Sequence, residues 1–198
     1  MTDVQTLDGR NQRRVRNAER IYDAAMDLFQ KRPYGDVSVE SICRAAGVGR
    51  ATFFRIFDGK AGLLKEFNRR MVIDIEERLD LTGEKNVRTV LTIIGVGIAD
   101  AWSQSTPGAT EMMIEFSQSV SLANMHAAHP ELLALFVQTV REGQNAGDIK
   151  HDFPPELLGS LALFQISAAA TFWVVEPGHD LHQLMKAAVE NFLNGAQT

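Results

Sequence analysis

The sequence predicts an all-α fold in which a small N-terminal three-helix unit precedes a larger helical bundle. Apolar residues recur at the three- and four-residue spacing of a helix face along most of the 198 residues, and no alternating run indicates a sheet. With 45% hydrophobic and 23% charged residues, the composition is that of an ordinary globular chain. The chain is long enough to bury a sizeable core.

The cysteine content and the first residues bear on the compartment. Cys43 is the single cysteine, which excludes an internal disulfide framework and fits a reducing environment. The first 20 residues contain no apolar stretch of the kind that forms a secretory signal. We therefore expect a cytoplasmic protein.

The first predicted helix spans about residues 12–31. One face carries apolar residues at helical spacing, namely Ala18, Ile21, Ala25 and Leu28. Pro33 and Gly35 then stop the helix. A start signal follows, because Ser38 can cap a short helix whose first-turn Glu40 suits the helix dipole.

A tight turn separates this short helix from the next one. Gly47 is placed to end the first of the pair in a left-handed conformation, and a second short helix begins within a few residues. Two short helices joined by a glycine-containing turn form the helix-turn-helix pattern.

The second helix of this pair has two chemically different faces. At about 100° per residue, one face groups large apolar side chains with a hydroxyl: Thr52, Phe53, Ile56 and Phe57. The opposite face carries Arg50, Ala51, Phe54 and Arg55, which do not resemble a core. The first face can dock on the protein, whereas the second suits the major groove of DNA.

Charge is divided unevenly along the chain. Residues 1–70 hold 14 Lys and Arg against 9 Asp and Glu, whereas residues 71–198 hold 6 against 16. A basic head on an acidic body is typical of a chain whose head meets a polyanion. Chance clustering of surface charge is the alternative interpretation.

Individual DNA contacts can be assigned within this head. Arg50 can donate two hydrogen bonds to guanine, and Ala51 and Phe54 can contact a thymine methyl group. Phosphate contacts are expected from Thr52, Arg55 and Lys60, and from a basic N-terminal arm that could also enter a minor groove, with Arg10, Arg13, Arg14 and Arg16. Each arginine alone could equally be an ordinary surface charge, so the argument depends on their joint placement.

Several features of residues 19–67 occur in a fixed order. They are "AAMDLF", then Tyr34, then the Ser-capped "SVESICRAAGV", then "ATFFRIF", then Lys60 and "LL". In this order they resemble the DNA-binding domain of the TetR family of bacterial transcriptional regulators. Gly49, Phe54 and Ile56 depart from the residues common in that family.

The resemblance implies a function and a domain organisation. Residues 1–60 would form the DNA-binding domain, and residues 61–198 would form a helical domain for effector binding and dimerisation. A homodimer would bind double-stranded operator DNA as a repressor, and a small, largely apolar effector would release it. The recognition-helix positions would be Arg50, Ala51, Thr52, Phe54 and Arg55, with Lys60 as the phosphate-contacting lysine.

Glycines and prolines divide the second domain into predicted helices. These cover residues 59–81, 84–105, 109–125, 130–147, 154–176 and 180–195. Residues 157–175 carry no charge and could span a bilayer by length, but their polar members and the lack of a cationic flank favour a soluble helix buried on most sides. The resemblance implies that the last two helices form the dimer seam, where we place Gly159, Ala162, Gln165, Ala169, Leu184 and Ala188.

The resemblance also implies an effector pocket among the helices of the second domain. Apolar, adaptable side chains in the bundle are the candidates, although each could equally be core: Trp102, Met112, Met113, Phe116, Met125, Phe164 and Trp173. No cofactor or metal is expected, because His126 with His129, and His179 with His182, lack companion ligands at metal-binding spacing.

Enzymes are disfavoured because the chain has no nucleophile-elbow, phosphate-loop or dinucleotide motif. The alternative to a DNA-binding regulator is a helical ligand-binding or protein-interaction dimer whose head does not bind DNA. The sequence leaves open the operator, the regulated genes and the identity of the effector.

Overall fold

The computed structural model describes residues 3–103, 108, 110–112, 114, 129–176 and 178–196, with side chains described from residue 9 onward and to residue 195. The described part is helical and contains no strand. It divides into two compact units, Met1–Glu66 with Ser105–Met112 and Phe67–Gln104 with Met113–Thr198. The all-α prediction is confirmed.

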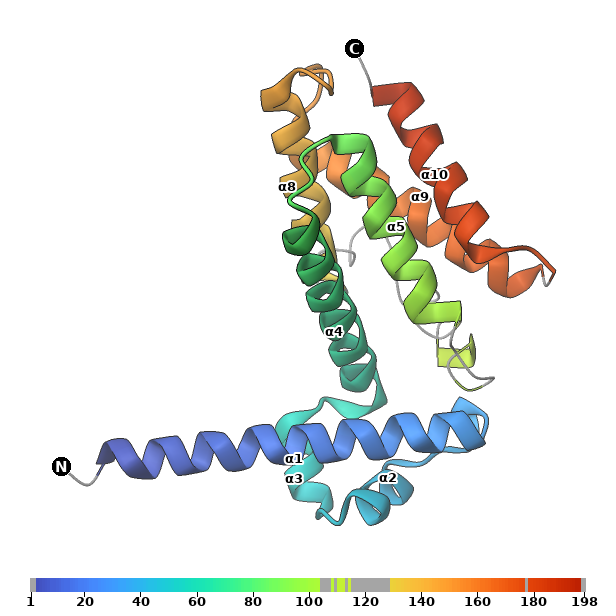
Figure 1. Cartoon of the computed structure of the whole chain (residues 1–198). Coiled ribbons are helices and arrows are strands. Elements are labelled where there is room, and N and C mark those ends of the chain that lie inside the picture. The colour runs from blue at the N-terminus through green and yellow to red at the C-terminus, as the bar shows by residue number, and fades with distance from the viewer. Residues whose placement is uncertain are drawn as a thin grey trace. The chain divides into compact units, whose positions relative to one another are not determined.

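The first unit packs two short helices against a long one (Figure 1). Helix α1 (Asp3–Lys31) is followed by a 3-10 turn (Tyr34–Asp36), α2 (Val39–Ala46), α3 (Arg50–Ile56) and the first residues of α4 (Gly59–Thr82). The core of this unit contains side chains that are fully buried or nearly so, including Ile21, Ala25, Phe29, Ile42 and Phe53. Cys43 is also buried, and its burial raises the pKa of the thiol.

The predicted caps of the helix-turn-helix are confirmed. The Ser38 hydroxyl accepts a hydrogen bond from the Ser41 backbone N–H at 3.1 Å. Gly47 ends α2 at a φ of 62°, and the Val48 N–H then donates to the Cys43 carbonyl at 3.0 Å. These two ends fix the length of α2 and the point where α3 begins.

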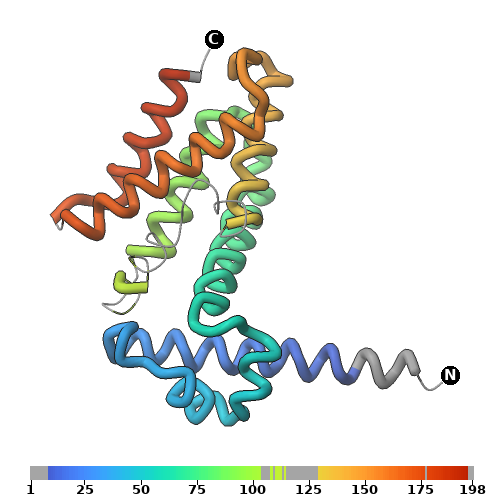
Figure 2. The backbone as a smooth tube through the Cα atoms, turned by 180° about the vertical axis from the view of Figure 1, so that it is seen from behind, coloured from blue at the N-terminus to red at the C-terminus, as the bar shows by residue number. Residues whose placement is uncertain are grey.

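The second unit contains the rest of α4, α5 (Val87–Ser103), α8 (Pro130–Ala146), α9 (Pro155–Val175) and α10 (Leu181–Ala196). Helix α9 packs between α8 and α10, and α5 also contacts both of them (Figure 2). The predicted ends at Gly83 and Gly147 are confirmed by their left-handed φ values of 60° and 83°. The helix predicted at residues 109–125 falls almost entirely outside the described residues.

Helix α9 differs from the prediction that it is buried on most sides. Of its most apolar window, 28% is buried, and one face remains exposed on the protomer. This face, here called the α9 stripe, consists of Leu157, Leu161, Phe164, Phe172 and Val175, whose exposed fractions range from 44% to 65%. By length and composition α9 could cross a membrane, but core helices of soluble proteins pass the same test.

Two residues predicted at the dimer seam lie inside the protomer instead. Ala162 is 3% exposed, and Gly159 approaches α8 so closely that an added Cβ would lie 2.7 Å from the Val137 side chain. Their small size serves the packing of α9 on α8. The other four predicted seam residues, Gln165, Ala169, Leu184 and Ala188, are half-buried.

Candidate nucleic-acid interface and effector cavity

The two predicted faces of α3 are present in the structure. Phe53 is 0% and Phe57 6% exposed, and their ring centroids lie 5.9 Å apart. Arg50, Ala51, Phe54 and Arg55 are exposed on the other side, Phe54 by 49%. Thr52 and Ile56 are half-buried at the boundary. The protein therefore keeps an Arg-Ala-Phe-Arg surface in solvent, and burial of the opposite face holds it there.

Arg50 has two neighbours that orient its side chain. Its guanidinium pairs with the Glu40 carboxylate of α2, and its Cζ lies 5.7 Å from the Phe54 ring centroid. The side chain nevertheless remains 61% exposed. The sequence indicated a helix-dipole role for Glu40, whereas the pair with Arg50 depends on the turn that brings the two helices together.

Lys60 is held close to the chain rather than extended into solvent. Its ammonium donates to the Tyr34 carbonyl at 2.8 Å and lies 4.0 Å from the Tyr34 ring centroid. A lysine ammonium carries three N–H groups, so this bond leaves donors for a further acceptor. The anchoring places the charge at a defined position at the start of α4.

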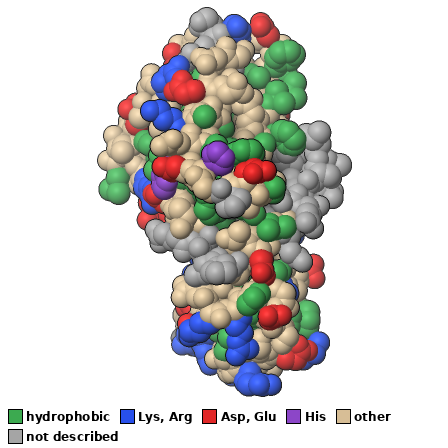
Figure 3. Space-filling model, turned by 90° about the vertical axis from the view of Figure 1, so that its right-hand side faces the viewer, with side chains coloured by type: hydrophobic (Ala, Val, Ile, Leu, Met, Phe, Trp, Pro, Cys, Tyr) green, Lys and Arg blue, Asp and Glu red, His purple; other side chains and the backbone are tan. Residues whose placement is uncertain are grey.

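The predicted N-terminal arm is part of a helix. Arg10, Arg13, Arg14 and Arg16 are exposed and lie within α1, which begins at Asp3, earlier than the predicted residue 12. A helix about 10–12 Å wide does not fit the minor groove, which is about 6 Å wide. The helix itself therefore cannot enter a minor groove, whereas its exposed arginine side chains can meet phosphates or reach into the groove from the helix surface. Figure 3 shows Lys and Arg side chains gathered over the first unit.

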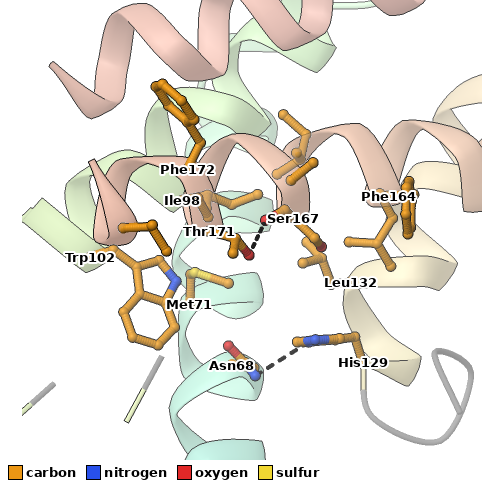
Figure 4. A pocket seen from close by; sticks show the side chains of 15 residues that line it. Asn68, Met71, Ile98, Trp102, His129, Leu132, Phe164, Ser167, Thr171 and Phe172 are labelled. Carbon is orange, nitrogen blue, oxygen red and sulfur yellow. Dashed lines mark hydrogen bonds between the residues drawn. The ribbon is translucent and has the colours of Figure 1, made fainter. Parts of the chain in front are cut away.

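A cavity of about 480 Å³ lies within the second unit. It is formed by residues of α4, α5, α9, the start of α8 and the residue before it (Figure 4). Apolar side chains dominate the wall, including Met71, Ile98, Trp102, Leu132, Leu163, Phe164, Ile166 and Phe172. This volume is within the range of small-molecule sites.

The predicted pocket residues are only partly brought together. Trp102 and Phe164 line the cavity, whereas Trp173 is not among its lining residues. Met112 is fully buried, but it belongs to the first unit. The remaining three, Met113, Phe116 and Met125, lie outside the described residues.

A buried polar pair marks one side of the cavity. Asn68 and His129 are 4% and 6% exposed, and Asn68 Nδ2 lies 3.3 Å from His129 Nδ1. Burial lowers the pKa of His129 to about 4, so its imidazole is neutral near pH 7. Figure 4 shows this pair at a distance from Ser167 and Thr171 on α9, where Thr171 donates to the Ser167 carbonyl at 2.9 Å.

No pattern in the sequence indicates that this pair lies in a pocket. His129 with His126 suggests only a weak metal pair, and Asn68 carries no signal because Asn68 and His129 are 61 positions apart. His182 of the second histidine pair instead bonds Asp100 through Nε2 at 2.8 Å. Among the described residues, no group of three or more His, Cys, Asp or Glu side chains could hold a metal ion.

The second short helix of a glycine-turn pair carries an exposed Arg-Ala-Phe-Arg surface, and the same chain contains a helical unit with an apolar cavity. This combination is typical of helix-turn-helix regulators. Residues 21–67 match the family described as bacterial regulatory proteins of the tetR family. Residues 21–67 are therefore a domain of the tetR family of bacterial regulatory proteins.

Known proteins similar to this chain agree with that assignment. A Mycobacterium tuberculosis protein, provisionally named mycofactocin biosynthesis transcriptional regulator MftR, is 25% identical over 184 residues, which cover 90% of each chain. The structure resembles the transcriptional repressor FadR of Thermus thermophilus, solved with lauroyl-CoA, at a TM-score of 0.73 and 24% identity, over 90% of this chain and 94% of that one. It also resembles Bacillus subtilis FadR, solved with stearoyl-CoA, at a TM-score of 0.68 and 22% identity, over 89% of this chain and 98% of that one.

Proposed function

We propose that this regulator is a repressor that binds operator DNA as a homodimer and is released by a small, largely apolar effector. The observation that carries the proposal is the exposed face of α3, which keeps two guanidinium groups and an aromatic ring in solvent while the opposite face is buried. Guanidinium groups beside a methyl group and an aromatic ring match the chemistry of base edges and phosphates in a major groove. The regulator would act in the cytoplasm, where the bacterial chromosome lies.

We assign the reading of bases to the exposed face of α3. The residues at the flanks of this face would position the helix on the DNA. Arg50, released from Glu40, would donate to guanine O6 and N7, while Ala51 and Phe54 would contact thymine methyl groups. Phosphate contacts would come from Thr52, Arg55, Lys60, Arg13, Arg14 and Arg16. The half-buried position of Lys60 favours a fixed phosphate contact over a mobile one.

The α9 stripe supports a two-fold dimer. Its five apolar side chains recur along one helix face from Leu157 to Val175 and are exposed on the protomer. A second copy seated on this stripe would bury it, together with the half-buried Gln165, Ala169, Leu184 and Ala188. Two recognition helices can then reach major grooves about 34 Å apart, which one copy cannot do.

The cavity of the second unit is the proposed effector site. Its wall is mostly apolar, in agreement with an effector that transfers from water into the protein by hydrophobic burial. An effector that binds better to a conformation with wrongly spaced recognition helices would lower operator affinity in proportion to that preference.

DNA binding is tested by fluorescence anisotropy on the duplex upstream of the regulator's own gene. If the dimer neutralises 6–10 phosphates, affinity should fall by about 10³–10⁵ between 50 and 200 mM salt. Arg50→Ala should change sequence preference by about 1–3 kcal/mol, whereas Lys60→Ala should weaken all duplexes alike.

A matched control removes a cation from the other unit. Arg141 lies on α8 and pairs with Glu156 at 2.7 Å, so Arg141→Ala should leave DNA affinity unchanged. Indifference of the wild-type dimer to every duplex in dilute buffer would instead favour a ligand-binding or protein-interaction dimer whose head does not bind DNA.

A further inference from the structure

The cavity wall of the second unit is uncharged throughout its described lining. None of the 15 described residues that line it is Lys, Arg, Asp or Glu, and four of these residues are polar: Asn68, His129, Ser167 and Thr171. His129 cannot supply a positive charge near pH 7, because burial holds its pKa at about 4. An ionised ligand group inside this wall would therefore lose its hydration and meet no opposite charge.

The polar residues of the wall are neutral hydrogen-bonding groups that lie on two sides. Asn68 and His129 form a pair 3.3 Å apart that is almost completely buried. When Asn68 donates to Nδ1, the neutral imidazole carries its proton on Nε2. On α9, the Thr171 hydroxyl is already used as a donor to the Ser167 carbonyl. Asn68 and His129 are buried more deeply than Ser167 and Thr171, so water competes least for a ligand group at this pair. We therefore take the pair as the recognition point for a single neutral polar head group.

The size and the edge of the cavity limit the rest of the ligand. At protein packing density, 480 Å³ holds roughly 15–20 non-hydrogen atoms. The lining residues that are also exposed are apolar, namely Phe164, Ala168, Phe172 and Val175. Three of these, Phe164, Phe172 and Val175, belong to the α9 stripe, so in the proposed dimer this edge lies against the apolar stripe of the second copy and is unsuited to a phosphate group.

We propose that the effector is an uncharged molecule of about this size, with one neutral oxygen head group at the Asn68–His129 pair and an aliphatic or aromatic body along α9, and that ionised fatty acids and coenzyme A thioesters are discriminated against. This inference rests on the proposed function only in taking the cavity as the effector site. The proposed preference for an uncharged ligand distinguishes this chain from two structural neighbours that were solved with acyl-CoA molecules.

The test compares three probes on the DNA-free protein. 2-Undecanone, undecanoate and lauroyl-CoA are titrated below their micelle concentrations at pH 7.5, with calorimetry and with tryptophan fluorescence. A Trp173→Phe background leaves Trp102, which lies in the cavity wall, as the fluorophore. 2-Undecanone should bind at least tenfold more tightly than either charged probe. Equal or tighter binding of undecanoate or lauroyl-CoA would overturn the proposal, as would failure of all three to bind.

Two variants test whether 2-undecanone binds in this cavity. Ala170→Phe fills the cavity from α9 and should abolish 2-undecanone binding. Asn68→Leu combined with His129→Leu removes both members of the pair at once and should weaken the binding about tenfold. The control, His151→Leu, removes a histidine outside the lining and should leave the ketone affinity unchanged. Unchanged binding by folded Ala170→Phe protein, judged by circular dichroism, would place the ligand elsewhere and refute the proposal.

The outcome is separable from that of the DNA experiment. A protein that binds 2-undecanone through this cavity but ignores all duplexes would refute the repressor and leave the ligand inference standing. A protein with salt-dependent DNA binding that prefers the carboxylate would refute the ligand inference alone.

Discussion

Phe53 and Phe54 are neighbours in α3 that serve opposite purposes, so one substitution at each position separates fold from function. Phe53 is 0% exposed and Phe54 49% exposed, although their ring centroids are only 5.3 Å apart. Phe53→Ala removes a fully buried ring and should cost about 3–5 kcal/mol of unfolding free energy. Phe54→Ala removes a ring that already faces solvent and should change stability by less than about 0.5 kcal/mol.

The two variants should also differ in DNA binding. Phe54→Ala loses the proposed thymine-methyl contact, worth about 1 kcal/mol or roughly fivefold in affinity. Phe53→Ala should lower the melting temperature by about 6–20 °C. Well below that temperature, its folded fraction should retain the affinity of the wild-type protein for those base pairs.

The measurements are thermal melts by circular dichroism and fluorescence anisotropy on the same duplex at one salt concentration. A large loss of stability in Phe54→Ala would mean that this ring belongs to the core. Unchanged DNA affinity in Phe54→Ala, together with unchanged affinity in Arg50→Ala, would refute the assignment of this face to the major groove.

Three further predictions concern the second unit. Leu161→Glu should shift the protein toward monomer in sedimentation velocity, because it places a charge in the α9 stripe, where the side chain is 44% exposed on the protomer. Gly97→Ala should cost about 1–3 kcal/mol in chemical denaturation, because the new Cβ would lie 2.4 Å from Ile75 Cγ1. The unfolding free energy should fall by about 3 kcal/mol per chain from pH 6.5 to pH 4 through His129 alone.

The sign of the His129 effect follows from its lowered pKa. Between pH 6.5 and about 4 the unfolded chain binds a proton that the folded chain does not, so the stabilisation is complete above pH 6.5 and is lost as the pH falls. Carboxylates also make the unfolding free energy depend on pH at low pH. The variant His129→Leu should keep this carboxylate contribution and lose only the contribution of the histidine. An identical pH profile in that variant would contradict the assignment.

Matched controls exist for the other two predictions. Ala134→Glu adds the same charge at an exposed position of α8 and should leave the dimer intact. Gly195→Ala in α10 meets no atom within 4 Å and should be neutral or stabilising by about 0.5–1 kcal/mol. A monomer in Ala134→Glu, or equal losses in the two glycine variants, would contradict the reasoning.

Residues close together in the sequence determine much of the structure of the first unit. The Ser38 cap, the Gly47 turn and the two faces of α3 were all predictable, because capping and helical periodicity depend on residues only a few positions apart. The exposed Arg-Ala-Phe-Arg surface follows from the same periodicity, since burying Phe53 and Phe57 forces Arg50 and Phe54 outward.

Tertiary packing decides which side of α9 is exposed and which residues line the cavity, and the periodicity of the sequence does not indicate either. Helix α9 is apolar on nearly every side, so its sequence does not indicate which side meets α8 and which remains exposed; the close approach of Gly159 to Val137 sets that rotation. The cavity brings Asn68, His129 and Ser167 together from distant segments, and no local pattern relates them. Their burial in one wall, without a charged neighbour in the described lining, is a property of the folded unit because desolvation depends on every surrounding helix.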